Sequence, residues 1–218
     1  MSISEIVTIT DPQSSAAEAY RTLRTNIEFS SVDKPIRTLL VTSSTPTEEK
    51  ASTVANLAVA MADGDRSIIL VDADLRRPAQ HTLFGLANDR GFTNLFRDDG
   101  ALNNPPLQAV SNTSLQLLTS GPLPPIPGQL LASRKINQVI AKLTGMAEMV
   151  IFDAPPIMTV NDASLLASQV DGVLLVVRAG GEKRDHVRAA KDRLQKVNAH
   201  LIGAVLTNAR VDAALHYS

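Results

Sequence analysis

The sequence contains no cysteine and no tryptophan, and aromatic residues make up only 3% of its 218 residues. Without cysteine the chain has no disulfide framework, no thiolate metal site and no cysteine nucleophile. The shortage of aromatic rings argues against a surface that stacks the bases of a nucleic acid. The missing disulfides are typical of a protein kept in a reducing compartment.

Long apolar runs and runs of basic residues are missing as well. The longest apolar stretches, such as residues 172–177, have the length of a strand and are too short to cross a bilayer. Residues 1–12 do not resemble a signal peptide, because they lack a basic start and a continuous apolar stretch. The formal net charge is −1, so a broad nucleic-acid surface is not indicated. We therefore expect a cytoplasmic protein that binds no nucleic acid.

What the chain does contain is a regular alternation of apolar and amphipathic segments. Several of the apolar segments are hydrophobic at consecutive positions, as strands buried on both faces must be. Such an alternation predicts repeated βαβ units and a doubly wound, mainly parallel sheet with helices on both faces. We expect one α/β domain over residues 1–218. The strands are predicted at 38–43, 67–72, 114–118, 149–153, 173–178 and 201–206, and the helices at 52–62, 129–143, 162–168 and 183–197.

A further helix is predicted over residues 15–29, ahead of the first strand. Glu18, Arg21 and Arg24 follow one another at intervals of three and leave a charged stripe beside the apolar face. On spacing alone, a solvated face with a Glu18–Arg21 pair worth a few tenths of a kcal/mol is favoured over an interface between subunits.

The first strand leads into a segment with the context of a phosphate-binding loop. Residues 43–53 read SSTPTEEKAST, which gives a loop, a lysine and hydroxyl residues before a helix. Lys50 is present, but Thr47 and Glu49 stand where such loops carry glycine, and Ala51 stands where a hydroxyl binds Mg²⁺. Taken alone, the segment is better explained by a capped helix start.

Acidic residues follow two of the predicted strands. Asp72 and Asp74 end the second one, and Asp153 ends the strand at 149–153. Because the carboxyl ends of parallel strands meet at one edge, these carboxylates and the loop with Lys50 are expected to lie together. Carboxylates can hold Mg²⁺ and orient or deprotonate a hydroxyl nucleophile. A single aspartate here is more often a helix cap, but three beside Lys50 favour a nucleotide site.

Taken in order, these segments resemble the catalytic domain of the bacterial tyrosine kinases of the CpsD/CapB/Wzc type, which control capsule and exopolysaccharide synthesis. The resemblance covers nearly all of the chain. It implies a P-loop NTPase fold of the MinD/ParA kind and ATP-dependent autophosphorylation on tyrosine, with ATP or ADP and Mg²⁺ as ligands. The matching segments are EAYRTLRTNI at 18–27, DADLRRP at 72–78, GPLPP at 121–125, DAPP at 153–156 and DGVLLVVRAG at 171–180.

The resemblance also implies roles for individual residues. Lys50, Asp72 and Asp74 are the expected catalytic residues, and Asp72, Asp153 and Ser52 the expected metal ligands. Tyr217 is the one tail tyrosine that could accept phosphate, where members of the family usually carry a cluster. The expected nucleotide-binding residues are Thr47, Glu48, Glu49, Lys50, Ala51, Ser52 and Asn208.

For assembly, the resemblance reverses the preference that spacing gave. It implies that residues 14–30 form an oligomerisation helix, in which Glu18, Arg21 and Arg24 join subunits into a ring. It also implies a transmembrane polysaccharide co-polymerase or activator as partner. Such a partner would bring a cytoplasmic chain to the inner face of the plasma membrane.

Three functions stay open on these grounds. The first is an active autophosphorylating kinase, and the second is the same domain with impaired nucleotide binding and turnover, acting through contacts. The third is a positioning ATPase of the MinD/ParA type, which is disfavoured because those proteins carry a second lysine early in the loop, where this chain has Thr45. We favour the impaired kinase, because phosphate contacts supply most nucleotide affinity in P-loop proteins.

Overall fold

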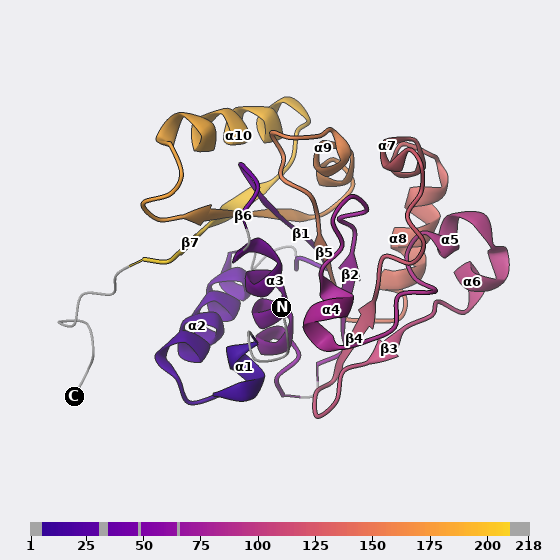
Figure 1. Cartoon of the computed structure of the whole chain (residues 1–218), viewed down its shortest axis with the longest axis horizontal. Coiled ribbons are helices and arrows are strands. Elements are labelled where there is room, and N and C mark those ends of the chain that lie inside the picture. Colours follow the sequence, from indigo (N-terminus) through magenta and orange to yellow (C-terminus); the bar gives the residue numbers. More distant parts are fainter. Residues whose placement is uncertain (1–5, 31–34, 48, 65, 210–218) are drawn as a thin grey trace.

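The structure is a computed structural model that describes residues 6–30, 35–47, 49–64 and 66–209. Its centre is one seven-stranded sheet in the order β3-β4-β2-β5-β1-β6-β7 (Figure 1). All neighbouring strands are parallel except β3 and β4, which are antiparallel. The strands are β1 Thr38–Ser43, β2 Ile68–Asp72, β3 Gln108–Ala109, β4 Leu115–Leu118, β5 Met149–Asp153, β6 Gly172–Arg178 and β7 Leu201–Thr207.

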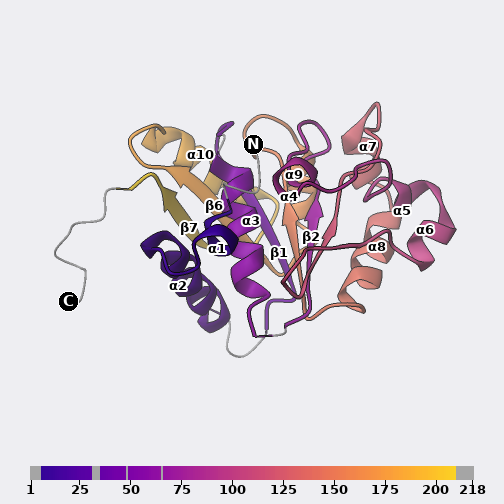
Figure 2. The same ribbon diagram turned by 60° about the horizontal axis from the view of Figure 1, so that its bottom comes forward.

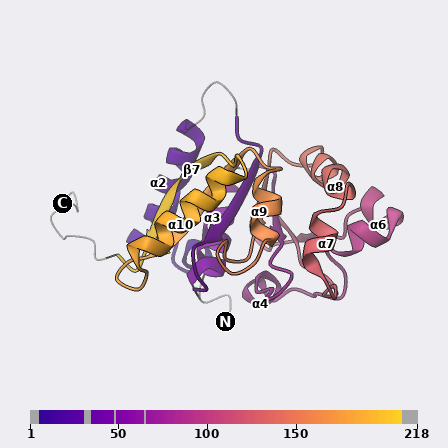
Figure 3. The same ribbon diagram turned by 90° about the horizontal axis from the view of Figure 1, so that it is seen from above.

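Helices cover both faces of this sheet. Each face has its own hydrophobic core, one packed beneath α3 and α4 and the other beneath α8, α9 and α10. Figure 3 shows α7 to α10 on the near face with α2 and α3 behind them. The helices are α1 Val7–Thr10, α2 Ser15–Phe29, α3 Glu49–Met61, α4 Gln80–Phe84, α5 Asn94–Arg97, α6 Asp99–Asn103, α7 Pro127–Leu131, α8 Lys135–Thr144, α9 Asp162–Ala167 and α10 Arg184–Lys196.

Strand register decides which side chains meet at the carboxyl edge. The inner strands β1, β2 and β5 are buried along their whole length, which explains their consecutive apolar residues. Within the sheet, β5 lies between β1 and β2, with Val41 opposite Asp153 and Asp72 opposite Asp153. The chain therefore delivers these two aspartates as neighbours, directly beside the end of β1.

Helix α2 packs beside α3 and belongs to the same hydrophobic core. Figure 2 shows it on the outer side of α3. Its start is fixed by Ser14, whose hydroxyl accepts a hydrogen bond from the backbone N–H of Ala17 at 3.2 Å. Tyr20 is partly buried against the core under α3, where burial raises the pKa of its hydroxyl. Tyr20 is thus a packing residue.

The predicted fold class is confirmed, and the helix predicted over 15–29 coincides with α2. The single helix predicted over 129–143 is wrong, because α7 ends at Leu131 and α8 begins at Lys135. Between them the Ser133 hydroxyl donates to the Leu130 carbonyl at 2.7 Å, which competes with the backbone bond of a continuous helix. The helix predicted from residue 52 begins at Glu49, so Lys50 lies in the first turn of α3.

Candidate functional site

Lys50 and Asp153 form the centre of the candidate site. The Lys50 ammonium contacts Asp153 Oδ1 and lies 3.6 Å from Asp74 Oδ2, and all three side chains are almost wholly buried. Burial alone lowers the pKa of Lys50, but the negative charges of Asp153 and Asp74 outweigh it and raise that pKa. The lysine therefore stays charged, and in this structure its charge is already balanced by the protein.

Asp72 is the most deeply placed carboxylate. Its Oδ2 accepts hydrogen bonds from the backbone N–H groups of Ala79 at 3.0 Å and Gln80 at 2.9 Å, so it caps the start of α4. Its Oδ1 is buried with no hydrogen-bond partner among the described residues. Burial, and then the neighbouring charge of Asp153, raise the pKa of Asp72 well above its usual range. One oxygen is thus structural and the other is available to a proton, a metal or a hydroxyl.

Asp74 also serves the backbone around it. Its Oδ1 accepts from the N–H groups of Arg76 at 3.4 Å and Arg77 at 3.1 Å, which shapes the turn after β2. Burial raises its pKa, although Lys50 acts in the opposite direction. Both aspartates of this segment therefore fill the capping roles that a strand-end aspartate commonly has, while keeping an oxygen directed elsewhere.

Gln80 belongs to this cluster although nothing in the sequence marks it. Its side chain is fully buried, and Nε2 donates to Asp153 Oδ2 at 2.7 Å and to the Ala51 carbonyl at 3.0 Å. Its backbone N–H donates to Oδ2 of Asp72. Gln80 therefore connects the segments after β1, β2 and β5.

The loop before α3 replaces glycine without adopting a glycine conformation. Thr47 does not take up a positive φ, and Glu49 is the first residue of α3. The carboxylate of Glu49 lies 3.2 Å from Arg178 Nε and accepts a hydrogen bond from the Thr207 hydroxyl. The charge of Glu49 is therefore directed to the ends of β6 and β7.

A second carboxylate holds the beginning of the same loop. Glu182, after β6, accepts hydrogen bonds from the Thr45 N–H at 3.0 Å and the Thr45 hydroxyl at 2.8 Å. The Ser44 hydroxyl donates to the same oxygen. The end of β6 and the segment after it thus hold the loop, because Arg178 contacts Glu49 and Glu182 contacts Ser44 and Thr45. Nothing in the sequence predicted these contacts.

An open cavity of about 720 Å³ adjoins these residues. Its polar wall carries the positive charges of Lys50, Arg76 and Arg77, and the first of these arginines is held by Asp162 through bonds of 2.7 and 3.3 Å. Three basic groups beside a helix N-terminus suit a phosphorylated ligand. The lining residues are Pro46, Thr47, Lys50, Ala51, Asp74, Arg76, Arg77, Ala79, Pro155, Pro156, Thr159 and Val160.

The carboxylates do not form a complete metal cage. Among the described residues, no group of three or more His, Cys, Asp or Glu side chains is arranged to hold a metal ion. Mg²⁺ beside a nucleotide commonly takes only one or two carboxylates and completes its shell with phosphate oxygens and water. The unpartnered Oδ1 of Asp72 fits that use. Ser52 instead donates its hydroxyl to the Glu49 carbonyl at 3.0 Å.

The remaining predicted site residues are peripheral or undescribed. Asn208 is exposed, has a φ of 53°, and follows Thr207, which contacts Glu49. That order brings Asn208 near the start of α3. Glu48 and Tyr217 lie outside the described residues.

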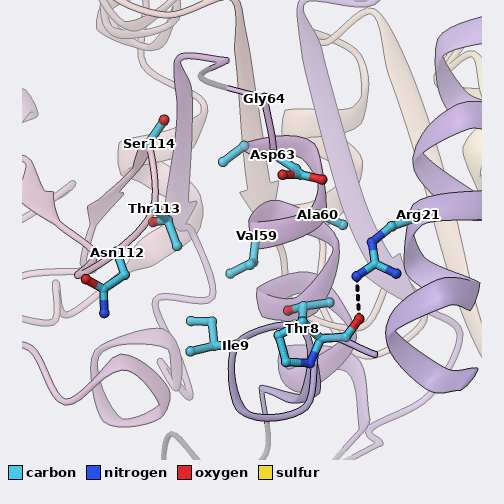
Figure 4. Close-up of a pocket in the computed structure, with 12 residues that line it drawn as sticks. Thr8, Ile9, Arg21, Val59, Ala60, Asp63, Gly64, Asn112, Thr113 and Ser114 are labelled. Atoms are coloured by element: carbon cyan, nitrogen blue, oxygen red, sulfur yellow. Dashed lines mark hydrogen bonds between the residues drawn. The ribbon is translucent and has the colours of Figure 1, made fainter. Parts of the chain in front are cut away.

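The predicted interface stripe of α2 is engaged within the chain. Arg21 Nη1 lies 2.5 Å from Glu18 Oε2, and its Nη2 donates to the Pro12 carbonyl. Arg24 donates to the Ala60 carbonyl in the last turn of α3 at 3.0 Å and lies 3.7 Å from Asp63. Figure 4 shows Arg21 facing a second cavity, of about 650 Å³, bordered by α1 and the end of α3.

No helix of the described residues has both the length and the apolar character needed to cross a bilayer. No protein-family model matches the sequence.

Individual known proteins do match. The tyrosine-protein kinase YwqD of Bacillus subtilis (strain 168) is 38% identical over 212 residues, which cover 97% of this chain and 89% of YwqD. The kinase domain of the Escherichia coli tyrosine kinase ETK superposes with a TM-score of 0.89 at 30% identity, over 98% of this chain and 83% of that one. The septum site-determining protein MinD of Pyrococcus horikoshii, solved with Mg-ADP, superposes with a TM-score of 0.65 at 19% identity. The match covers 78% of this chain and 69% of the MinD chain, and it shows a shared fold alone.

Proposed function

The chain belongs to the family of bacterial tyrosine-protein kinases, and on that premise we propose that it is an ATP- and Mg²⁺-dependent tyrosine kinase domain of capsule or exopolysaccharide synthesis with impaired nucleotide binding and turnover. One observation carries the proposal: Lys50, Asp74 and Asp153 converge beside the cavity, while Glu49, at a position where such loops carry glycine, is the first residue of α3. The aspartates expected to bind metal are present, but the glycines of a phosphate-binding loop are replaced by Thr47 and Glu49.

The chemistry assigned to the site is phosphoryl transfer from ATP to a tyrosine hydroxyl. The phenolic oxygen forms the new bond to the γ-phosphorus, the bond to the β,γ-bridging oxygen breaks, and ADP leaves. Asp72 accepts the phenolic proton, for which a carboxylate with a raised pKa and a free oxygen is suited. Lys50 balances charge on the phosphate oxygens once the ligand draws it from Asp153. Mg²⁺, held by Asp153 directly and by Asp72 through a bound water, would supply further charge neutralisation.

Calorimetric titration with Mg·ATP and Mg·ADP tests the binding part of the proposal. We expect dissociation constants weaker than about 1 μM, because Glu49 adds a negative charge near the phosphates. Mass spectrometry after purification from a kinase-free host tests turnover, and Tyr217 is the proposed acceptor. Binding tighter than this, together with rapid autophosphorylation, would instead establish a fully active kinase.

The Glu49–Arg178 contact gives a separate prediction. Both side chains are partly exposed, at 31% and 53%, so the pair itself contributes no more than about 1 kcal/mol. We expect Arg178→Met to weaken Mg·ATP binding by about 3-fold, because the Glu49 carboxylate is then free to approach the phosphates.

A double-mutant cycle with calorimetry checks this assignment. In a Glu49→Gln background the Arg178→Met substitution should have no effect on affinity. An equal loss in both backgrounds would mean that Arg178 contacts the nucleotide itself and does not act by restraining Glu49.

For assembly, we propose that α2 joins subunits head to tail into a ring. Arg21 and Arg24 line or border the cavity of Figure 4, which offers a hollow next to the charged stripe for side chains of a neighbouring copy. Heterologous contacts of this kind close into a ring when the rotation per subunit allows it. The intrachain partners of both arginines would have to be exchanged on association.

We expect an oligomer that depends on protein concentration and weakens with salt. Charge reversal by Glu18→Arg or Arg21→Glu should shift it to monomer, since directional arginine–carboxylate contacts are lost. Light scattering at high concentration and low salt measures this, with Asp185→Arg on the exposed face of α10 as a charge-matched control for Glu18→Arg. Wild-type protein that stays monomeric there, with or without nucleotide, would leave α2 as a solvated face.

The proposed partner is a transmembrane polysaccharide co-polymerase or activator, which would hold the domain at the inner face of the plasma membrane. The family relationship supports this partner, and the described part of the chain supplies no spanning helix of its own. Co-purification from membranes with and without the co-expressed partner would test it.

A further inference from the structure

Gln80 is an uncharged residue of the candidate site whose side-chain amide is held by hydrogen bonds to two other segments. It is fully buried on the first residue of α4, eight residues beyond Asp72. Its Nε2 makes two hydrogen bonds, to Asp153 Oδ2 at 2.7 Å and to the Ala51 carbonyl at 3.0 Å. An amide with both donors used on a carboxylate and on the phosphate-loop helix has one orientation only.

The Gln80 amide restrains the orientation of the Asp153 carboxylate. Its two oxygens are divided between two donors, with Oδ1 at the Lys50 ammonium and Oδ2 at the Gln80 amide. If a bound phosphate draws the Lys50 ammonium away from Asp153, Gln80 alone then orients the Asp153 carboxylate. Gln80 therefore fixes the direction in which Oδ1 points when the lysine turns to phosphate.

Gln80 also leaves an acceptor unused. Its Oε1 is buried without a partner among the described residues, and so is Oδ1 of Asp72. The two residues are joined, because the Gln80 N–H donates to the other oxygen of Asp72. Burying an acceptor without a donor is unfavourable, and a water bound to a cation would satisfy both oxygens.

We propose that Gln80 is a positioning residue for Mg²⁺ in the nucleotide complex. Its amide orients Asp153 as a metal ligand, and its carbonyl oxygen accepts a hydrogen bond from metal-bound water beside Asp72. The inference rests on the proposed function, because it concerns the same site. It assigns to Gln80 the magnesium-dependent part of nucleotide affinity and not the binding of the nucleotide as such.

The test compares ATP binding in excess Mg²⁺ and in EDTA for wild type and Gln80→Met, which keeps the length and approximate volume of the side chain. The ratio of the two dissociation constants is the magnesium increment. We expect Gln80→Met to reduce that increment about 10-fold or more, as loss of an outer-shell partner does, with affinity in EDTA changed less than about 3-fold.

Gln108→Met is the matched control. Gln108 also donates its amide to a backbone carbonyl, that of Ala87 at 2.8 Å, but it lies on the edge strand β3. Its magnesium increment should equal that of wild type. A Gln80→Met protein with a lower melting temperature and an undiminished increment would show a purely structural role and overturn the proposal.

A second variant and a second background distinguish loss of folding and loss of nucleotide binding from loss of magnesium positioning. If Gln80→Met fails to fold, Gln80→Asn retains the amide on a side chain one methylene shorter, and the same loss of increment is expected. All variants are also measured in the Thr47→Gly, Glu49→Gly, Ala51→Ser background. If the wild type binds no nucleotide, the proposed function is contradicted. If the Gln80 substitutions leave the magnesium increment unchanged in the restored background, this inference is contradicted.

Discussion

Restoring the phosphate loop with Thr47→Gly, Glu49→Gly and Ala51→Ser is expected to tighten Mg·ATP binding by about 100-fold or more. Glu49 supplies the largest part, because it adds a negative charge to the first residue of the helix that would face the phosphates. Two like charges about 4 Å apart would repel by roughly 1 kcal/mol in water and several times that in a partly dry site, which sets the upper limit of this effect. Glycine also lets the backbone N–H groups approach the phosphates closely. The Ala51→Ser substitution would return a metal-binding hydroxyl next to Ser52, whose own hydroxyl now bonds the Glu49 carbonyl.

The structure sharpens this expectation beyond the count of lost glycines. Glu49 is held at the head of α3 by Arg178 and Thr207, so its removal frees two donors at the ends of β6 and β7. Calorimetry of the triple variant measures the gain, and Glu148→Gly, distant from the loop at the start of β5, controls for the change in net charge. An affinity that is unchanged by the triple substitution would mean that the loop does not limit binding.

Much of the fold follows from local patterns. The strands β1, β2 and β5 are apolar at consecutive positions and bounded by aspartate or serine, so both their extent and their parallel burial could be predicted. The convergence of Lys50 with Asp74 and Asp153 follows from the same reasoning, because parallel strands deliver their carboxyl ends to one edge. Family membership rests on similarity across almost the whole chain.

What the sequence did not reveal depends on side-chain partners far apart in the chain. No motif or spacing in the sequence marks Gln80 as a site residue. It reaches Asp153 because β2 pairs with β5 in a register that places Asp72 opposite Asp153. Glu182 and Arg178 reach the loop because β6 runs beside β1, which fixes their distance from residues more than a hundred positions earlier. Short helices such as α4 and α5 carry too few residues to show a period.

Asp72→Asn is expected to abolish phosphotransfer, with a loss of about 10³-fold or more, and at the same time to stabilise the metal-free protein at neutral pH. The first effect follows because asparagine cannot accept the tyrosine proton. The second follows because burial and the charge of Asp153 raise the pKa of Asp72 above its unfolded value. The folded protein then holds a proton that the unfolded chain has released, so the stability of the wild type falls as pH rises through this range.

The pH dependence separates this mechanism from a general change in packing. The stabilising contribution of protonated Asp72 is fully present below the unfolded pKa, near 4, and is lost as pH rises through the raised folded pKa. Asparagine does not titrate and can still accept the N–H groups of Ala79 and Gln80. The stability difference between Asp72→Asn and wild type should therefore grow with pH, to about 1 kcal/mol or more.

Urea unfolding in EDTA at a series of pH values measures this difference, and Asp63→Asn, at an exposed position after α3, should leave the pH profile unchanged. In a parallel series with Mg·ATP in place of EDTA the order is expected to reverse, because Mg·ATP stabilises the protein that retains the Asp72 carboxylate. A variant that becomes less stable relative to wild type as pH rises would show that ionised Asp72 stabilises the fold. The metal-free site would then hold its buried carboxylates without a stability cost, and Lys50 alone would balance them.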